Sequence, residues 1–309
     1  AKATVASLEL PTAAQARLLV ETLARIDMPQ EGLEVLKRRP PAQMRDTSLW
    51  VLHGKLLEVT AQWDDLSSLG MSLRSMPGVG GTMDELSYSM EALAKSKQLR
   101  PDMAQLAAKR ASDAQAGDTA AVLQASAWLL DAGMARASID VLKKAENNLK
   151  GSVLYWGRRM MAASQAPDAD EMLRSSEQAM ALAPGNRAVA NNYAATLVLT
   201  GHKPAEAVKL TFENLTQFPG SPDFQINHAI ALLLNDRIEE AQKVLLEVQA
   251  DRLTAVQRAN FHLAWLDVSV RSRKWSEARE RGLLIDRAQL MPLQLAKLDI
   301  LQKQVIRAN

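Results

Sequence analysis

Four histidines are the side chains of this sequence best suited to metal binding or proton transfer: His53, His202, His228 and His262. Metal sites and catalytic triads need such groups close together, often one helical turn apart as in a His-Glu-x-x-His pattern. Here the histidines lie far apart without that spacing, and there is no cysteine to supply a thiolate. We therefore expect no catalytic residue, no metal site and no bound cofactor.

A glycine cluster, "MPGVGGTMDE" at Met76–Glu85, is the one stretch that suggests phosphate binding. Helix N-termini do bind phosphate, but a phosphate loop follows a strand and carries a Lys-Ser/Thr pair, and neither feature is present. We expect a loop inserted between helical units. Thr82 and Glu85 have the spacing of a capping box, which predicts a helix start at this point.

The basic run "RSRKWSEARER", from Arg271 to Arg281, contains five basic side chains in eleven residues. It has two interpretations: a solvated turn and helix face, or a surface that docks onto an acidic partner. Its surroundings are uneven in charge, because residues 251–309 hold 11 basic and 6 acidic residues whereas residues 167–250 hold 6 basic and 11 acidic. Arg271, Arg273 and Lys274 are the candidate contacts.

The composition favours a helical, folded protein. The 309 residues are 47% hydrophobic, 23% charged and only 4% aromatic, with a net charge of +2. This balance argues against disorder and gives no reason to expect nucleic acid as a partner. No apolar run is long enough to span a membrane. We expect a cytoplasmic protein; a processed segment upstream of Ala1 would instead place it in the periplasm.

A repeat of about 34 residues runs through the chain. It is defined by one position near the start of a helical block: Gly32, Leu66, Ala104, Ser138, Met172, Ala207, Ala241 and Ala278. The intervals are 34, 38, 34, 34, 35, 34 and 37 residues. Periods of this length are typical of helical repeat proteins, so the sequence predicts eight units.

Each unit carries two helical patterns. In the second, an apolar residue such as Leu36, Leu142 or Leu245 follows four after the repeat position, which places both on one helix face. Ser221-Pro222 supplies a start signal, with serine at the N-cap and proline at the first helical position. No segment alternates with a period of two. The fold class is therefore all-α.

These blocks match the tetratricopeptide signature, W-x2-L-G-x2-Y followed by A-x3-F and P. Four residues stand in its first part: Trp50, His53, Gly54 and Leu57. Met172–Pro184 and Ala207–Pro219 reproduce the interval from the small position to the proline. The chain thus resembles tetratricopeptide-repeat proteins over roughly residues 13–285, with a looser likeness to bacterial proteins of kinesin-light-chain type.

The resemblance implies a right-handed α-solenoid of about eight repeats in residues 1–285 and a C-terminal capping helix in residues 286–309. The capping helix is expected to cover the last repeat with Leu293, Ala296, Leu298 and Ile300–Leu301. Its basic residues, Lys297, Lys303 and Arg307, are expected to face water.

Gly54 lies inside a predicted helix, where glycine costs about 1 kcal/mol relative to alanine. We expect it at the closest approach of the two helices of its own hairpin, with Trp50 and Trp63 covering the ends of that contact. Leu66 and Met172 are larger than the small residue usual at the repeat position. Their two hairpins are expected to open or shift in register.

A solenoid of helix pairs presents a groove lined by the first helices, and such grooves hold peptides, helices or protein surfaces. We therefore expect a non-catalytic interaction scaffold with a protein partner. The carboxylate clamp known in this family is not matched, because Glu21 has the wrong sign beside Arg17, and Lys55 follows Val51 rather than asparagine. The groove positions chosen by register are Arg17, Lys55, Arg158, Asn191, Gln225 and Asp267.

Two further interpretations stay open at this stage. One is an adaptor on a cytoskeletal filament, with the basic C-terminal end on the acidic surface of a tubulin-like bacterial polymer. The other is a scaffold for envelope assembly in the periplasm. The sequence gives no oligomeric state.

Overall fold

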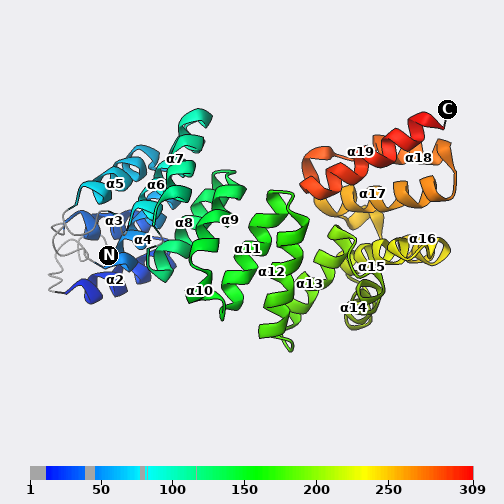
Figure 1. Cartoon of the computed structure of the whole chain (residues 1–309), viewed down its shortest axis with the longest axis horizontal. Coiled ribbons are helices and arrows are strands. Elements are labelled where there is room, and N and C mark those ends of the chain that lie inside the picture. The colour runs from blue at the N-terminus through cyan, green and yellow to red at the C-terminus, as the bar shows by residue number, and fades with distance from the viewer. Residues whose placement is uncertain (1–11, 39–45, 77–80, 82, 116, 309) are drawn as a thin grey trace. The chain divides into compact units, whose positions relative to one another are not determined.

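The structure is a computed structural model that describes residues 12–38, 46–76, 81, 83–115 and 117–308. Within these ranges the chain is helical and contains no strand (Figure 1), which confirms the predicted fold class. The chain divides into two compact units, Ala1–Gly151 and Ser152–Asn309. This division falls at a different place from the predicted boundary at residue 285, and the C-terminal helix belongs to the second unit.

The N-terminal unit contains four successive helix pairs in its described part. They are α2 (Ala13–Arg25) with α3 (Pro29–Lys37), α4 (Thr47–Val59) with α5 (Trp63–Ser75), α6 (Asp84–Lys97) with α7 (Pro101–Asp113), and α8 (Thr119–Asp131) with α9 (Ala135–Lys144). A short helix, α10 (Glu146–Leu149), follows the last pair.

The C-terminal unit contains four more pairs and a final helix. They are α11 (Val153–Gln165) with α12 (Ala169–Leu182), α13 (Arg187–Thr200) with α14 (Pro204–Gln217), α15 (Pro222–Leu234) with α16 (Ile238–Leu246), and α17 (Ala255–Arg271) with α18 (Trp275–Leu283), then α19 (Pro292–Arg307). Two 3₁₀ turns, at Ala250–Arg252 and Arg287–Gln289, complete the unit.

In every pair the link between the two helices is three residues long, as at residues 26–28. The middle residue of most links takes a left-handed conformation, for example Asp27 (φ 59°), Ala61 (φ 54°) and Asp236 (φ 55°). A left-handed residue after a helix satisfies its last carbonyl groups and reverses the chain. The short links therefore place the two helices of a pair side by side.

The eight repeat positions all have the same structural role. Each is the fourth residue of the second helix of its pair, and each is buried, as Ser138, Ala207 and Ala278 illustrate with no exposed surface. Burial at the same point of successive helices explains why the sequence keeps an interval near 34 residues. The predicted periodicity is confirmed in the described residues, and the right-handed superhelix stays a prediction.

The predicted reason for Gly54 is wrong. A Cβ atom at Gly54 would lie 2.4 Å from the Trp128 ring and 3.1 Å from the Met90 methyl group, and neither belongs to the partner helix α5. Trp128 comes from α8, two pairs further on, and its indole N–H donates a 2.7 Å hydrogen bond to Glu58 Oε2 on α4. Gly54 thus makes room for an indole that packs α8 against α4 within the N-terminal unit.

A close approach of two helix backbones occurs at Gly70, but between neighbouring pairs and not within one hairpin as expected at Gly54. A Cβ atom there would lie 2.6 Å from the carbonyl oxygen of Ser87, on α6. Backbone cannot move aside as a side-chain tip can, so α5 and α6 approach this closely because residue 70 has no side chain.

The prediction for the two large repeat residues is half right. Leu66 and Met172 are both buried. The α4–α5 pair containing Leu66 packs less closely than any other pair, as predicted, whereas α11 and α12, which contain Met172, are among the most closely packed.

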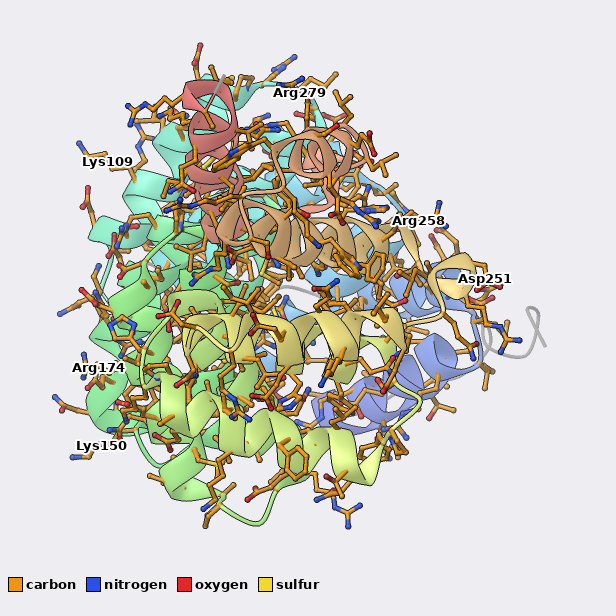
Figure 2. The ribbon with its side chains drawn as sticks, turned by 90° about the vertical axis from the view of Figure 1, so that its right-hand side faces the viewer. Lys109, Lys150, Arg174, Asp251, Arg258 and Arg279 are labelled. Atoms are coloured by element: carbon orange, nitrogen blue, oxygen red, sulfur yellow. The ribbon has the colours of Figure 1, made fainter. Side chains whose placement is uncertain are left out.

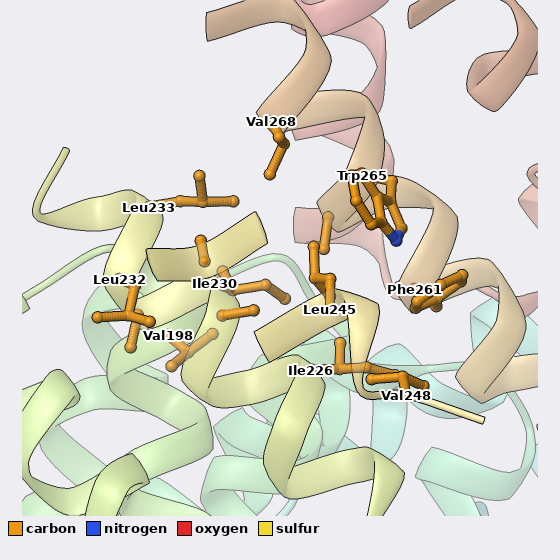
Figure 3. Packing of buried hydrophobic residues seen from close by; sticks show 14 of the residues in the cluster. Val198, Ile226, Ile230, Leu232, Leu233, Leu245, Val248, Phe261, Trp265 and Val268 are labelled. Carbon is orange, nitrogen blue, oxygen red and sulfur yellow. The ribbon is translucent and has the colours of Figure 1, made fainter. Parts of the chain in front are cut away.

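The core of the C-terminal unit fills the space between successive pairs. Figure 3 shows members of one buried cluster from three helices: Ile226 and Leu233 of α15, Leu245 of α16, and the aromatic residues Phe261 and Trp265 of α17. All five side chains are buried. Ser221 does occupy the N-cap of α15 with Pro222 at the first helical position, although the serine hydroxyl makes no capping bond.

At the predicted capping box the helix α6 begins at Asp84 and its N-cap is Met83. Thr82 lies outside the described residues, as does most of the glycine cluster, so the box is not tested. Glu85 is buried, and one of its oxygens accepts a 2.8 Å hydrogen bond from the Gly117 N–H.

The C-terminal helix α19 covers the last pair largely as predicted. Leu298 and Leu301 are buried in a cluster with residues of α17 and α18, and Lys303 and Arg307 are exposed. Three expectations are wrong. Ala296, expected to cover the last repeat, is exposed. Ile300 is 58% exposed. Lys297 does not simply face water, because its ammonium group lies 2.7 Å from the buried carboxylate of Asp267.

Candidate protein-binding surface

An apolar pocket of about 440 Å³ opens between α11, α12 and α13 in the C-terminal unit. We call it the α11 pocket, and these residues line it: Val153, Leu154, Gly157, Arg158, Met160, Met161, Ser176, Ala179, Val189 and Asn192. Leu154 is 58% exposed and Met161 is 53% exposed. Large apolar side chains left in water beside a pocket mark a surface that has room for a partner.

The pocket exists because α11 presents a gap along one face. Leu154, Gly157 and Met161 are three and four residues apart, so they share a face of the helix. At Gly157 a Cβ atom would meet nothing within 4 Å. In addition, α11 packs against α12 but approaches α13 less closely than the later first helices, α13, α15 and α17, approach one another.

Two neighbouring arginines on α11 have opposite roles. Arg159 is fully buried, and its guanidinium pairs with Glu171 of α12 and donates a 2.7 Å hydrogen bond to the Tyr155 hydroxyl. This network fixes α11 against α12. Arg158 instead lines the pocket, and its Nε is buried without a hydrogen-bond partner among the described residues. The predicted site residue Arg158 therefore lies at the pocket wall.

A second pocket, polar and about 760 Å³ in volume, lies where α15 begins and α16 ends. The predicted residue Gln225 lines it beside Gln257 and Arg252. Gln225 is only 8% exposed, and no hydrogen bond of its side-chain amide is found in the described part of the chain. An amide in this position can pair with peptide groups, as the sequence suggests.

Two other predicted groove residues have partners within the fold. Asn191 accepts a 3.3 Å hydrogen bond from Asn214 of α14. Asp267 is 1% exposed and pairs with Arg271 at 2.8 Å and Lys297 at 2.7 Å. Burial acts to raise the pKa of the Asp267 carboxyl, but these two cations outweigh it and hold the pKa below its usual value.

The basic run divides into paired and unpaired residues. Arg271 bridges Asp267 and Asp236, with its second contact at 2.6 Å. Arg273 and Lys274 are exposed and form no ion pair among the described residues. Exposed basic side chains of this region, such as Arg279, extend away from the ribbon (Figure 2). Of the three predicted contacts, two are thus free to meet a partner.

The predicted residues of the N-terminal unit, Arg17 and Lys55, line neither of the two pockets described above. Arg17 lies 3.7 Å from both Glu21 and Asp46, on a partly exposed surface. Lys55 is exposed on α4, next to the glycine that accommodates Trp128. The Trp128 ring fills the space beside Gly54, between α4 and α8.

Three of the histidines, His53, His228 and His262, lie on different first helices and are at least partly buried, whereas His202 is exposed in the link between α13 and α14. His228 lies 3.0 Å from the Thr211 hydroxyl through Nδ1, and burial lowers its pKa. Burial, with Lys37 nearby, lowers the pKa of His53 to about 4. In the described ranges no group of three His, Cys, Asp or Glu residues is placed to hold a metal ion.

Of the residues chosen by register, Arg158 lines the α11 pocket and Gln225 lines the second pocket, but most of the α11 lining was not chosen. Leu154, Gly157 and Met161 were not chosen, because a sequence does not tell which apolar positions of a helix stay uncovered. One signal was present. A glycine inside a helix needs a reason, and Gly157 stands in the middle of α11 as Gly54 stands in α4.

The comparisons with known proteins bear on the fold. A scan of protein-family models and a search of curated proteins find no match. A crystal structure of a tetratricopeptide repeat protein from Parabacteroides merdae is similar, with a TM-score of 0.52 and 10% identity over 95% of this chain and 98% of that one. At this identity the likeness concerns the fold alone.

Two other solved structures are more distant. A chain of the Cut9–Hcn1 hetero-tetramer of APC/C has a TM-score of 0.42 and 13% identity, over 95% of this chain and 64% of that one. Yeast Tom70 has a TM-score of 0.30 and 11% identity, over 96% and 89%. Similarities this low carry no argument here.

In the part of the chain that the structure describes, no helix is long and apolar enough to cross a membrane. The helix pairs, the interval between their buried repeat positions and the likeness to the bacterial structure agree with one another. This chain therefore has the fold of the tetratricopeptide-repeat proteins.

Proposed function

We propose that this protein is a non-catalytic scaffold that binds a protein partner through the α11 pocket. Helix pairs of this fold present their first helices as an extended surface, and such surfaces bind peptides, helices and protein faces. The main support is the uncovered face of α11. There Leu154 and Met161 are exposed on either side of Gly157, where an added Cβ atom would meet nothing within 4 Å.

The chemistry of the pocket supports binding rather than catalysis. Its lining is mostly aliphatic and methionine, and its one charged side chain is that of Arg158. Apolar contact supplies affinity in such pockets, while a single polar group fixes orientation. None of the four histidines is among the residues that line this pocket.

Gly157 offers a direct test. A Cβ atom there would meet nothing within 4 Å, so a large side chain at this position is expected to extend into the pocket. Gly157→Phe is expected to abolish capture of the natural partner from native lysate, measured by quantitative mass spectrometry. Gly157→Ala is the matched control, since it adds only a methyl group and is expected to retain the partner. Equal capture by both variants would contradict the proposed site.

The basic run provides a second candidate surface, because Arg273 and Lys274 are exposed and unpaired in the described residues. Arg271 is unsuitable for the test, since its replacement would disturb the buried Asp267. If this surface docks an acidic partner, such as a filament, Arg273→Glu with Lys274→Glu should weaken binding and slow association. Binding through the pocket predicts that the double variant has little effect.

A further inference from the structure

We infer that the partner of the α11 pocket is an amphipathic helix that places a carboxylate against Arg158. The inference rests on the proposed function and specifies the kind of partner. It is drawn from two features of the same unit: the way α19 occupies the neighbouring part of the first-helix face, and the charge at the wall of the pocket.

The C-terminal helix shows how this protein covers its own first helices. Besides α17 and α18, α19 contacts α13 and reaches α11. Leu293, Gln294 and Lys297 of α19 meet α13, α15 and α17, and the space left between them is only about 30 Å³. The face of the first helices is therefore closed by a helix at α13–α17 and open over about 440 Å³ at α11–α13.

The contact made by α19 combines apolar packing with one ion pair. Leu298 is fully buried against the last pair, and Lys297 meets Asp267, a carboxylate on the first helix α17. The α11 pocket presents the same two elements with the charge reversed, namely aliphatic walls and a cation, Arg158, on the first helix α11. A helix that fits this pocket would carry an acidic residue where α19 carries Lys297.

Arg158 is suited to receive that acid. Its Nε lies buried without an acceptor in the described ranges, so part of the guanidinium has lost water and gained no hydrogen bond. A carboxylate that docks at the accessible part of the guanidinium pairs with the charge. The next cation along the helix, Arg159, is already matched by Glu171 and does not compete for the acid.

The lining also fits side chains projected from a helix. Leu154 and Met161 are two turns apart on α11, which matches apolar residues four or seven apart on a docked helix. Met160 and Met161 are flexible and adapt to side chains of different shape. The pocket therefore favours a class of partner, amphipathic acidic helices, and tolerates different apolar residues within that class.

The test uses a phage library of alanine-rich helices of about 18 residues, long enough to be helical alone, randomised along one face. Selection is made on the full chain, with removal of phage that also bind Gly157→Phe. The most enriched peptide is synthesised with its acidic residue intact and with that residue changed to the amide. Both peptides are titrated against the unchanged protein and against Arg158→Met, which keeps the stem and removes the charge.

Enriched helices are expected to carry leucine, methionine or phenylalanine with an aspartate or glutamate within one turn. The amide peptide and Arg158→Met should each weaken binding about tenfold or more, and the two changes together should weaken it no further. The inference would be overturned if helices bind in the pocket without an acidic residue, or if the effects of the two changes add. Either result would leave the α11 pocket as the proposed binding site. If no selected helix depends on Gly157, both the pocket and the inference fail.

Discussion

Glycines inside the helices of this protein serve two opposite purposes. Gly54 removes a side chain where Trp128 must lie, and Gly70 removes one where the α6 backbone passes. Gly157 removes one where nothing lies, and an opening to solvent results. The sequence shows the same anomaly, a glycine in a helix, in each case. What faces the glycine is set by residues distant in the sequence.

Identical substitutions at two of these glycines should give opposite results. Gly54→Leu is expected to lower the free energy of unfolding by about 1–3 kcal/mol, because the new side chain meets the Trp128 ring. Gly157→Leu should leave stability unchanged or raise it by up to about 1 kcal/mol, since leucine favours the helix more than glycine does. Urea unfolding of both variants compares them. Equal losses would mean that the Gly54 contact is not as described.

Glu85 should make stability depend on pH. Burial raises the pKa of its carboxyl to about 7, against the hydrogen bond from Gly117 and the charge of Lys144. A folded-state pKa above the unfolded value of 4.5 means that the stabilising contribution is complete below pH 4.5 and is lost as pH rises through 7.

Glu85→Gln, which cannot ionise, should therefore remove this loss. The wild-type urea midpoint is expected to fall more between pH 5 and pH 8 than that of the variant (roughly the window set by these two pKa values). His53 acts in the opposite direction, because its lowered pKa makes stability rise with pH from about 4 to 6.5. Comparing the two proteins at each pH cancels that contribution. Parallel pH curves would contradict the burial of a protonated Glu85.

At the scale of helices, the sequence predicts the pairs well because one buried position recurs in each. In each pair the fourth residue of the second helix is buried, and the link between the two helices is three residues long. The sequence therefore shows a regular interval between these buried positions. Contacts between different pairs produce no regular spacing in the sequence. Trp128 and Glu58 are 70 residues apart, and no local spacing relates them.

The same limit applies to α19. Its apolar stripe predicts a capping helix, and Leu298 and Leu301 are buried accordingly. Its reach to α13 and α11 depends on the direction of the helix after the turn at Arg287–Gln289, which periodicity does not determine. Lys297, expected in water, becomes part of the ion pair that attaches α19 to α17.

Removing that ion pair should destabilise the C-terminal unit. Lys297→Met keeps the stem and leaves the buried Asp267 carboxylate with Arg271 alone. We expect a loss of about 1–3 kcal/mol, less than for a fully buried pair because Lys297 is partly exposed. Lys303→Met, on the exposed side of the same helix, is the control and should be neutral. Equal stability of the two variants in urea would show that the ion pair does not hold α19.

For the molecule as a whole, a candidate binding surface is distinguished by first-helix residues that no other helix of the protein packs over. Register chose Arg158 and Gln225, which line pockets, together with Asn191 and Asp267, which have partners inside the fold. All four lie on first helices, Asp267 near the end of its helix and the other three in the first half of theirs. Only the three-dimensional structure separates them, because α19 and neighbouring helices cover some positions and leave others open.

The two candidate surfaces respond differently to salt. Charges on the exposed Arg273 and Lys274 are screened beyond a Debye length of about 8 Å at physiological ionic strength, whereas apolar contact in the α11 pocket is not. We expect partner affinity to change little between low and high salt and to survive Arg273→Glu with Lys274→Glu. Strong salt dependence together with loss of binding in that double variant would assign the partner to the basic run.

The central claim is that a protein partner occupies the α11 pocket. Hydrogen–deuterium exchange tests it most directly, with the captured partner bound to the full chain and the free chain as reference. Binding should slow exchange in α11 and in the part of α13 that contains Val189 and Asn192, and Gly157→Phe should remove that protection. Protection confined to the basic run at residues 271–281, or to the N-terminal unit, would contradict the claim.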